Sequence, residues 1–137
     1  MKFFPAGRAA ARADAARFTG EVWQEPINSA PEPARLASIR VTFLPGARTN
    51  WHSHPYGQTL FVVSGFGRIG TRTASGAGPV RILRPGDTVW FEPGEQHWHG
   101  AAPDSPMVHI AMQEKQDGRT ADWLEPVADE DYLQAPE

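Results

Sequence analysis

Histidines are the residues of this chain whose spacing points most directly to chemistry. The chain has five, all between positions 52 and 109, and four of them form the pairs His52/His54 and His97/His99. In an extended strand, residues i and i+2 point to the same side, so each pair can present two imidazoles to one point. Gln58 follows four residues after His54 and adds a hard amide oxygen. Because nitrogen donors with one oxygen donor suit a divalent first-row metal, the sequence predicts a metal site carried on β-strands.

The elements that must position these side chains are short strands separated by turns. Residues 38–43 alternate, which places Ile39, Val41 and Phe43 on one face. We expect these residues to form an apolar wall of a pocket; the alternative is an ordinary core strand, which has the same pattern. Residues 59–63 form a run that is apolar on both faces. With 13 Gly and 13 Pro spread along the chain, such strands predict an all-β sandwich or closed barrel.

We expect one domain over residues 1–137, with a barrel core at about 36–114, because a chain of this length suits a single core. The alanine-rich arm at 1–17 predicts a short helix or a loose arm. Residues 115–137 read as a polar C-terminal tail.

Three shorter segments carry their own predictions. Residues 18–23 read as one strand, and the proline-rich stretch 25–33 reads as a connecting loop. The acidic run that begins at Asp129 predicts a short terminal helix.

Composition excludes several classes of function. The net charge is −3, without a basic stripe, so nucleic acid is not expected as a partner. No apolar run approaches the ~20 residues of a membrane span, and no apolar signal segment follows the N-terminus. The absence of cysteine excludes thiolate metal sites and cysteine nucleophiles. We therefore expect a cytoplasmic protein that acts on a small-molecule substrate.

Two segments carry family motifs. The first runs Gly46-x5-His52-x-His54-x3-Gln58-x6-Gly65, and the second spans residues 85–97. The first matches the first motif of the cupin superfamily at every spacing, with Gln58 where glutamate is usual. The second resembles the second cupin motif, with Glu92 in place of the expected proline and Ala101 in place of the usual asparagine. The chain is similar, over most of its length, to the small single-domain bacterial cupins that include the manganese-dependent hydroxynitrile lyases.

This resemblance implies a double-stranded β-helix, also called a jelly-roll barrel, with short terminal extensions. It further implies four metal ligands: His52, His54, Gln58 and His97. Three neutral imidazoles and a neutral amide leave the full charge on a divalent ion, which favours Lewis-acid chemistry. Mn(II) is the expected metal, with Fe(II), Zn(II) and Ni(II) as alternatives.

The remaining two histidines are the candidate catalytic residues. In the strand over 107–113, one face carries His109 and Gln113, which suggests the lining of a substrate pocket. His109 is the expected proton-transfer base; the alternative is a core histidine held by a backbone carbonyl. His99 is expected to hydrogen-bond a neighbour rather than to bind metal, and it is the second candidate base.

The resemblance implies a lyase of the hydroxynitrile type, in which a cyanohydrin is split to an aldehyde and cyanide. An Fe- or Mn-dependent oxygenase or oxidase and a non-catalytic ligand-binding cupin are the alternatives. A homodimer or homotetramer is expected, because the strand over 59–63 is apolar on both faces and the arm before residue 35 has little to pack against.

Overall fold

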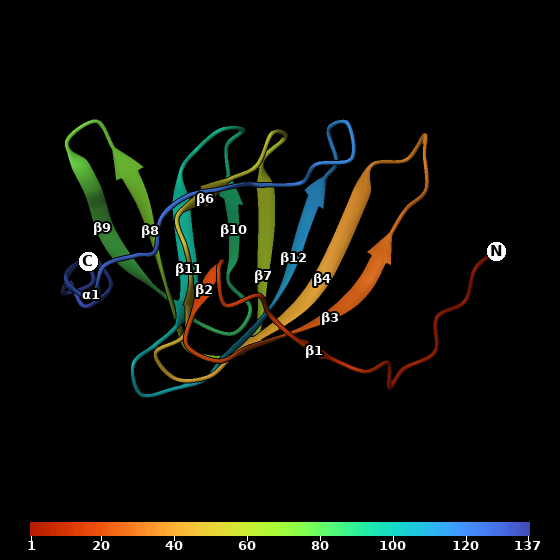
Figure 1. Ribbon diagram of the computed structural model, residues 1–137. Helices are drawn as coiled ribbons and strands as arrows, with labels where there is room; N and C mark the ends of the chain where they lie inside the picture. Colours follow the sequence, from red (N-terminus) through yellow and green to blue (C-terminus); the bar gives the residue numbers. More distant parts are fainter.

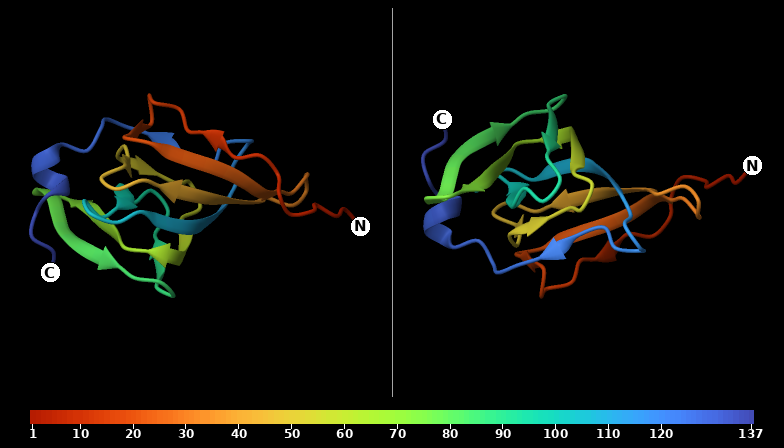
Figure 2. Two further views of the ribbon diagram at one scale, coloured as in Figure 1. Left: turned by 90° about the horizontal axis from the view of Figure 1, so that it is seen from below. Right: turned by 90° about the horizontal axis from the view of Figure 1, so that it is seen from above.

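The computed structural model describes residues 1–137, which form two curved antiparallel sheets around one interior (Figures 1 and 2). The first sheet contains, in spatial order, β1 (Ala11–Arg12), β3 (Val22–Ser29), β4 (Leu36–Phe43), β12 (Met107–Glu114), β7 (Gln58–Gly65) and β10 (Thr88–Phe91). The second contains β13 (Asp122–Trp123), β6 (His52–Ser53), β11 (His97–Ala101), β5 (Arg48–Thr49) and β2 (Phe18–Thr19). The hairpin of β8 (Gly67–Thr73) and β9 (Gly76–Leu83) extends the second sheet, since β8 pairs with β11.

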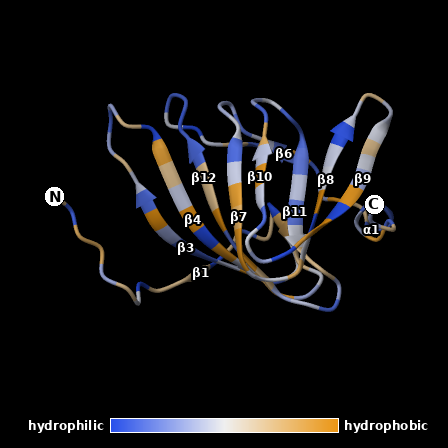
Figure 3. Cartoon of the chain, turned by 180° about the vertical axis from the view of Figure 1, so that it is seen from behind, coloured by the Kyte–Doolittle hydropathy of each residue, from blue (hydrophilic) through white to orange (hydrophobic).

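The core lies between the two sheets because successive residues of a strand face opposite sides, and burial alternates along β7 and β12. The hydropathy colouring shows apolar residues within the long strands (Figure 3). Its largest cluster includes the inward-facing side chains of β4, β7 and β12, among them Phe43, Leu60 and Met107, which are fully buried. A smaller cluster contains Trp98 and Tyr132. The Tyr132 hydroxyl donates to the carbonyl of Ala101 at 2.7 Å, which ties the C-terminal segment to β11.

The predicted all-β jelly-roll class is confirmed, as are several individual elements. The alternating segment 38–43 lies in β4, the apolar run 59–63 in β7 and the segment 107–113 in β12. The short helix predicted at Asp129 is α1 (Asp129–Tyr132). None of the helices is both long and apolar enough to cross a membrane.

The prediction of a loop over 25–33 is wrong for its first half, because β3 continues through Pro26 to Ser29. Only Trp23 and Gln24 of this strand pair with β1, so the strand is a sheet edge beyond that point. A proline is tolerated there because an edge strand does not need every backbone N–H for the ladder, and a register shift falls between Pro26 and Asn28.

Two other expectations for the N-terminal region need correction. The alanine-rich arm is extended, since its β1 segment pairs with β3 and the sheet edge offers hydrogen bonds that override helix propensity. Residues 18–23 are two strands in different sheets, with the chain crossing between the sheets at Gly20. Gly20 has φ of 81°, a conformation that glycine adopts without strain. The sheets thus extend beyond residues 36–114, since β1, β2 and β3 precede this range and β13 follows it.

Candidate metal centre and substrate pocket

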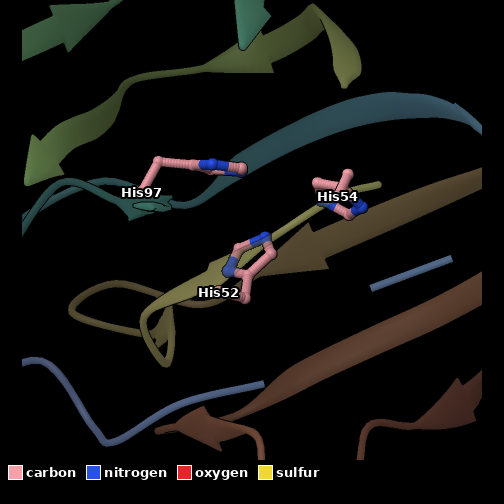
Figure 4. Close-up of side chains that lie close together, drawn as sticks. All are labelled: His52, His54 and His97. Carbon is pink, nitrogen blue, oxygen red and sulfur yellow. The ribbon is translucent and has the colours of Figure 1, made fainter. Parts of the chain in front are cut away.

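The three histidines among the four predicted ligands, His52, His54 and His97, lie close together between the strands (Figure 4). His52 lies on β6 and is the direct cross-strand partner of His97 on β11, while His54 follows β6. One ring nitrogen from each of the three lies within 4.8 Å of the other two, and all three side chains are buried. The spacing of the histidines in the sequence thus brings their rings together, because β6 and β11 are paired strands of one sheet.

Backbone carbonyls fix which nitrogen of each ring faces the centre. The Nδ1 of His52 lies 2.9 Å from the carbonyl oxygen of Asn50, that of His54 lies 2.7 Å from Thr120, and that of His97 lies 2.8 Å from Glu95. A carbonyl oxygen only accepts, so each Nδ1 carries the proton and donates. Each Nε2 is therefore left with a free lone pair, which is the tautomer a metal-binding imidazole requires.

Gln58, the first residue of β7, completes the donor set with its oxygen. Its Oε1 lies 3.2 Å from Nε2 of His97. With the His97 proton on Nδ1, both of these atoms are acceptors and neither supplies a hydrogen to the other. Nε2 of His54 is likewise buried without a partner. Lone pairs that lie this close together repel one another unless a cation accepts them. The residues present therefore suit a divalent metal.

Gln113 orients the Gln58 amide. Nε2 of Gln58 donates to Oε1 of Gln113 at 3.0 Å, and Nε2 of Gln113 donates in turn to the carbonyl of Ala37 at 3.2 Å. Because that carbonyl accepts only, the Gln113 amide has one favourable orientation, and it turns the Gln58 oxygen toward the imidazoles. Gln113 also lines the pocket, as the sequence predicted.

Two aromatic rings pack against the ligand imidazoles. Phe91 stacks on His97 with ring centroids 3.6 Å apart and an interplanar angle of 7°, and Trp123 stacks on His52 at 4.7 Å and 23°. Trp123 lies in the segment that the sequence predicts to be a polar C-terminal tail. The one signal available was a large aromatic residue in an otherwise polar segment, which does not reveal that β13 pairs with β6.

His99 and His109 lie in the same pocket and are hydrogen-bonded to each other. Nε2 of His109 lies 2.9 Å from Nδ1 of His99, and one of the two donates to the other. Nε2 of His99 and Nδ1 of His109 are buried and have no hydrogen-bond partner. The hydrogen-bond partner of the His109 Nε2 is therefore another imidazole and not a backbone carbonyl.

All five imidazoles are neutral near pH 7. Burial lowers the pKa of His97 to about 3 and that of His109 to about 4. Burial also holds the pKa of His52 and of His99 well below 6.5, and neighbouring imidazoles lower both further. The pKa of His54 is lowered too, again mainly by burial. The rings are thus available as metal ligands or as proton acceptors.

The ligands open into a cavity of about 300 Å³ between the sheets. The predicted apolar wall is in place, since Ile39, Val41 and Phe43 line this cavity together with His99 and His109. Phe43 packs against both histidines, with centroid distances of 5.9 Å to His99 and 5.3 Å to His109. The arrangement brings a candidate metal site, two hydrogen-bonded neutral imidazoles and an apolar wall to one small cavity.

The family model described as a cupin domain matches residues 39–112, which is more than half of the chain. The chain is a member of the cupin family. This cupin is 53% identical over 115 residues to an (R)-mandelonitrile lyase from Granulicella tundricola, and the match covers 84% of this chain and 85% of the relative.

Solved structures agree with this assignment. A cupin-like protein from Thermotoga maritima is 38% identical, with a TM-score of 0.85 and coverage of 98% of both chains. Oxalate decarboxylase from Bacillus subtilis is 22% identical, with a TM-score of 0.62 over 83% of this chain and 30% of that one. At this identity, the second likeness shows the shared fold alone.

Proposed function

We propose that this cupin is a metal-dependent lyase that splits cyanohydrins into an aldehyde or ketone and hydrogen cyanide. The observation that carries the proposal is the hydrogen-bonded His99–His109 pair in the same cavity as the converging metal ligands. A relative with 53% identity that is named an (R)-mandelonitrile lyase supports the same reaction.

The proposed metal is Mn(II), held by His52, His54, His97 and the oxygen of Gln58. Zinc prefers tetrahedral sites rich in nitrogen and sulfur, whereas imidazoles with an amide oxygen and open positions suit Mn(II) or Fe(II). Such an ion, when bound, supplies Lewis acidity that stabilises negative charge on a substrate oxygen or on departing cyanide.

The chain's own residues hold the substrate and move its proton. The apolar wall of Ile39, Val41 and Phe43 accommodates the organic part of the cyanohydrin. The His99–His109 pair takes the hydroxyl proton while the C–C bond breaks, and the electron pair of that bond leaves with cyanide. The oxygen lone pair forms the carbonyl, and the imidazole returns its proton to cyanide. Atoms and charge balance without an oxidant.

The test is the release of benzaldehyde from each enantiomer of mandelonitrile by protein loaded with Mn(II), Fe(II), Zn(II) or Ni(II). We expect metal-dependent release above the spontaneous rate, and loss of both metal and activity in His52→Ala. Metal loading without cleavage would contradict the proposal. Oxygen uptake by the iron form would then favour an oxygenase or oxidase, and the absence of any turnover would favour a ligand-binding cupin. The cytoplasmic location remains a prediction from the sequence.

A further inference from the structure

The residues that line the cavity carry formal charge of one sign only. Arg17 is the only side chain in the cavity lining that carries a formal charge near pH 7, because the lining imidazoles are neutral and no aspartate or glutamate is among the lining residues. The nearby carboxylate of Asp122 accepts from Nη1 of Arg119 at 2.7 Å, outside the cavity. Because Arg17 is exposed, this single positive charge lies at the rim of the cavity, and it is present before a metal ion binds.

Arg17 is held in place by its backbone and by an aromatic ring. Its N–H donates to the carbonyl of Asp14 at 3.0 Å, and its carbonyl accepts from the N–H of Asn50 at 2.8 Å. Its guanidinium carbon lies 5.4 Å from the ring centroid of Trp123, the ring that stacks on His52. The guanidinium therefore contacts the Trp123 ring, and that ring in turn stacks on His52, one of the proposed metal ligands.

The guanidinium has no ion-pair partner of its own. The four ion pairs of the protein involve Arg35, Arg48, Arg72 and Arg119, and no side-chain hydrogen bond of Arg17 is formed. The carboxylate of Asp14 instead accepts from the N–H of Ala16 at 2.9 Å. The donors of Arg17 are thus free for a ligand, and a guanidinium matches the two oxygens of a carboxylate.

We propose that Arg17 recognises a carboxylate on the substrate, so that the pocket prefers small molecules that place an anionic group beside Trp123 at the exposed rim of the cavity. This inference rests on the proposed function and narrows its substrate class to cyanohydrins or carbonyl compounds that also carry a carboxylate. The apolar wall then contacts the part of the molecule between the two ends.

The experiment measures binding without turnover. Calorimetry on the Mn(II)-loaded protein compares 4-(hydroxymethyl)benzoate with its neutral analogue of similar shape, 4-(hydroxymethyl)benzamide. We expect the acid to bind about tenfold more tightly, with a preference that shrinks as ionic strength rises. Arg17→Gln should reduce this ratio to near one. Arg12→Gln, which removes an exposed arginine of β1 outside the cavity, should leave it unchanged.

Three results would overturn the proposal: no preference for the acid in the parent protein, an equal preference in Arg17→Gln, or binding of neither probe at millimolar concentration. An equal preference in Arg17→Gln would assign the selectivity to the metal ion. Failure of the lyase proposal is a separate result, since it appears as absent cyanohydrin cleavage by the metal-loaded parent whatever the binding ratio.

Discussion

At the scale of single residues, the hydrogen-bond chain from Ala37 through Gln113 to Gln58 decides which atom of an amide faces the metal site. In Gln113→Leu the Gln58 amide loses its acceptor and can present its NH2 group instead. We expect affinity for Mn(II) to fall by about tenfold or more, the usual range for a residue that orients a ligand. A titration with Mn(II), followed by the electron paramagnetic resonance signal of the free ion, measures this affinity.

The matched variant is Gln113→Glu, which keeps an acceptor for Nε2 of Gln58. Gln113→Glu should bind Mn(II) at least as tightly as the parent protein. Equal losses in both variants would mean that Gln113 acts through packing rather than through the Gln58 amide.

His109→Ala tests the proton-transfer role at the same scale. The variant should keep its metal but lose roughly 10²–10⁴-fold in cyanohydrin cleavage, the usual contribution of a positioned acid–base group. Metal analysis and initial rates on the folded variant check this. Full activity at full metal content would exclude His109, and His99→Ala would then be the variant to compare.

The convergence of His52, His54 and His97 was predictable from the sequence because the period of a strand places His52 and His54, and His97 and His99, on shared faces. The hydrogen bond between His99 and His109 was not, since it depends on how closely β11 of one sheet approaches β12 of the other. Arg17 was missed for a similar reason. It precedes the two-residue strand β2, whose pairing with β5 brings it to the cavity.

At the scale of elements, the close approach of β5 to β11 keeps the ligand-bearing strand in register. A Cβ added at Gly100 would contact the carbonyl oxygen of Ala47 and lie 2.6 Å from Cα of Arg48, both backbone atoms. On the same two strands, the N–H of His99 donates to Oγ1 of Thr49 at 3.2 Å. Glycine at position 100 therefore permits the strand spacing that the site needs.

Gly100→Ala should push β5 away from β11. We expect the free energy of unfolding to fall by roughly 1–3 kcal/mol, the usual effect of overpacking, and metal affinity to fall as well. Urea unfolding measures the first effect and calorimetry the second. Unchanged values for both would show that β5 shifts freely without affecting the site.

Element boundaries were the part of the fold that the sequence predicted least well. Strands β4, β7 and β12 were predicted because the segments around Val41, Leu60 and His109 have a clear period or apolar run. Strand β3 was not, because Pro26 is typical of a loop, and only the position of the strand at a sheet edge explains why a proline is tolerated there.

At the scale of the whole molecule, an apolar outer face of the first sheet has no partner within the chain. Phe61 on β7 is 41% exposed and Trp90 on β10 is 50% exposed. Ile110 on β12 is the cross-strand partner of Phe61, and directly paired residues share a face. The segment before β1, which carries the exposed Phe3 and Phe4, extends away from the body (Figure 1).

We propose that a second copy of the chain covers this face in a two-fold dimer. The whole outer side of the sheet, over β3, β4, β12, β7 and β10, covers roughly 600 Å², and the apolar residues lie at its β12, β7 and β10 end. Together with the extended N-terminal segment, it approaches the roughly 800 Å² that each partner buries in a standard interface. A dimer formed in this way is the building unit of either expected assembly, homodimer or homotetramer.

The double variant Phe61→Glu/Trp90→Glu should shift the protein toward the monomer, because it places like charges at the centre of a two-fold interface. Light scattering coupled to size-exclusion chromatography at micromolar concentration measures the mass. Leu133→Glu, at an exposed position of the C-terminal segment, is the control and should leave the mass unchanged. A monomeric parent protein would contradict the proposal.

Acid sensitivity is also a property of the whole molecule, because all five histidines are buried. Their pKa values are lowered in the folded state, to about 3 for His97 and about 4 for His109, against 6.5 in an unfolded chain. Below pH 6.5 the unfolded state binds protons that the folded state does not. Stability should therefore be greatest above pH 6.5 and fall as the pH drops toward 4, by up to about 1.4 kcal/mol per pH unit for each such histidine.

Urea unfolding of the metal-free protein at pH 7.5, 6 and 5 measures this dependence. His109→Gln, which removes one of the five groups, should show a smaller loss between pH 6 and pH 5. A stability that is flat across this range would mean that the imidazoles take up protons without unfolding.

The carbonyl groups and aromatic rings that hold the ligand imidazoles have a consequence for entropy. His52 and His97 each have a fixed Nδ1 and a stacked ring, so their rotamer freedom is lost when the chain folds rather than when a metal ion arrives. The ordering of the site is thus part of the folding reaction, and the surrounding sheets supply the free energy for it. A chelator should remove the metal and leave a folded barrel whose site keeps its shape, unlike small domains in which metal binding and folding are a single event.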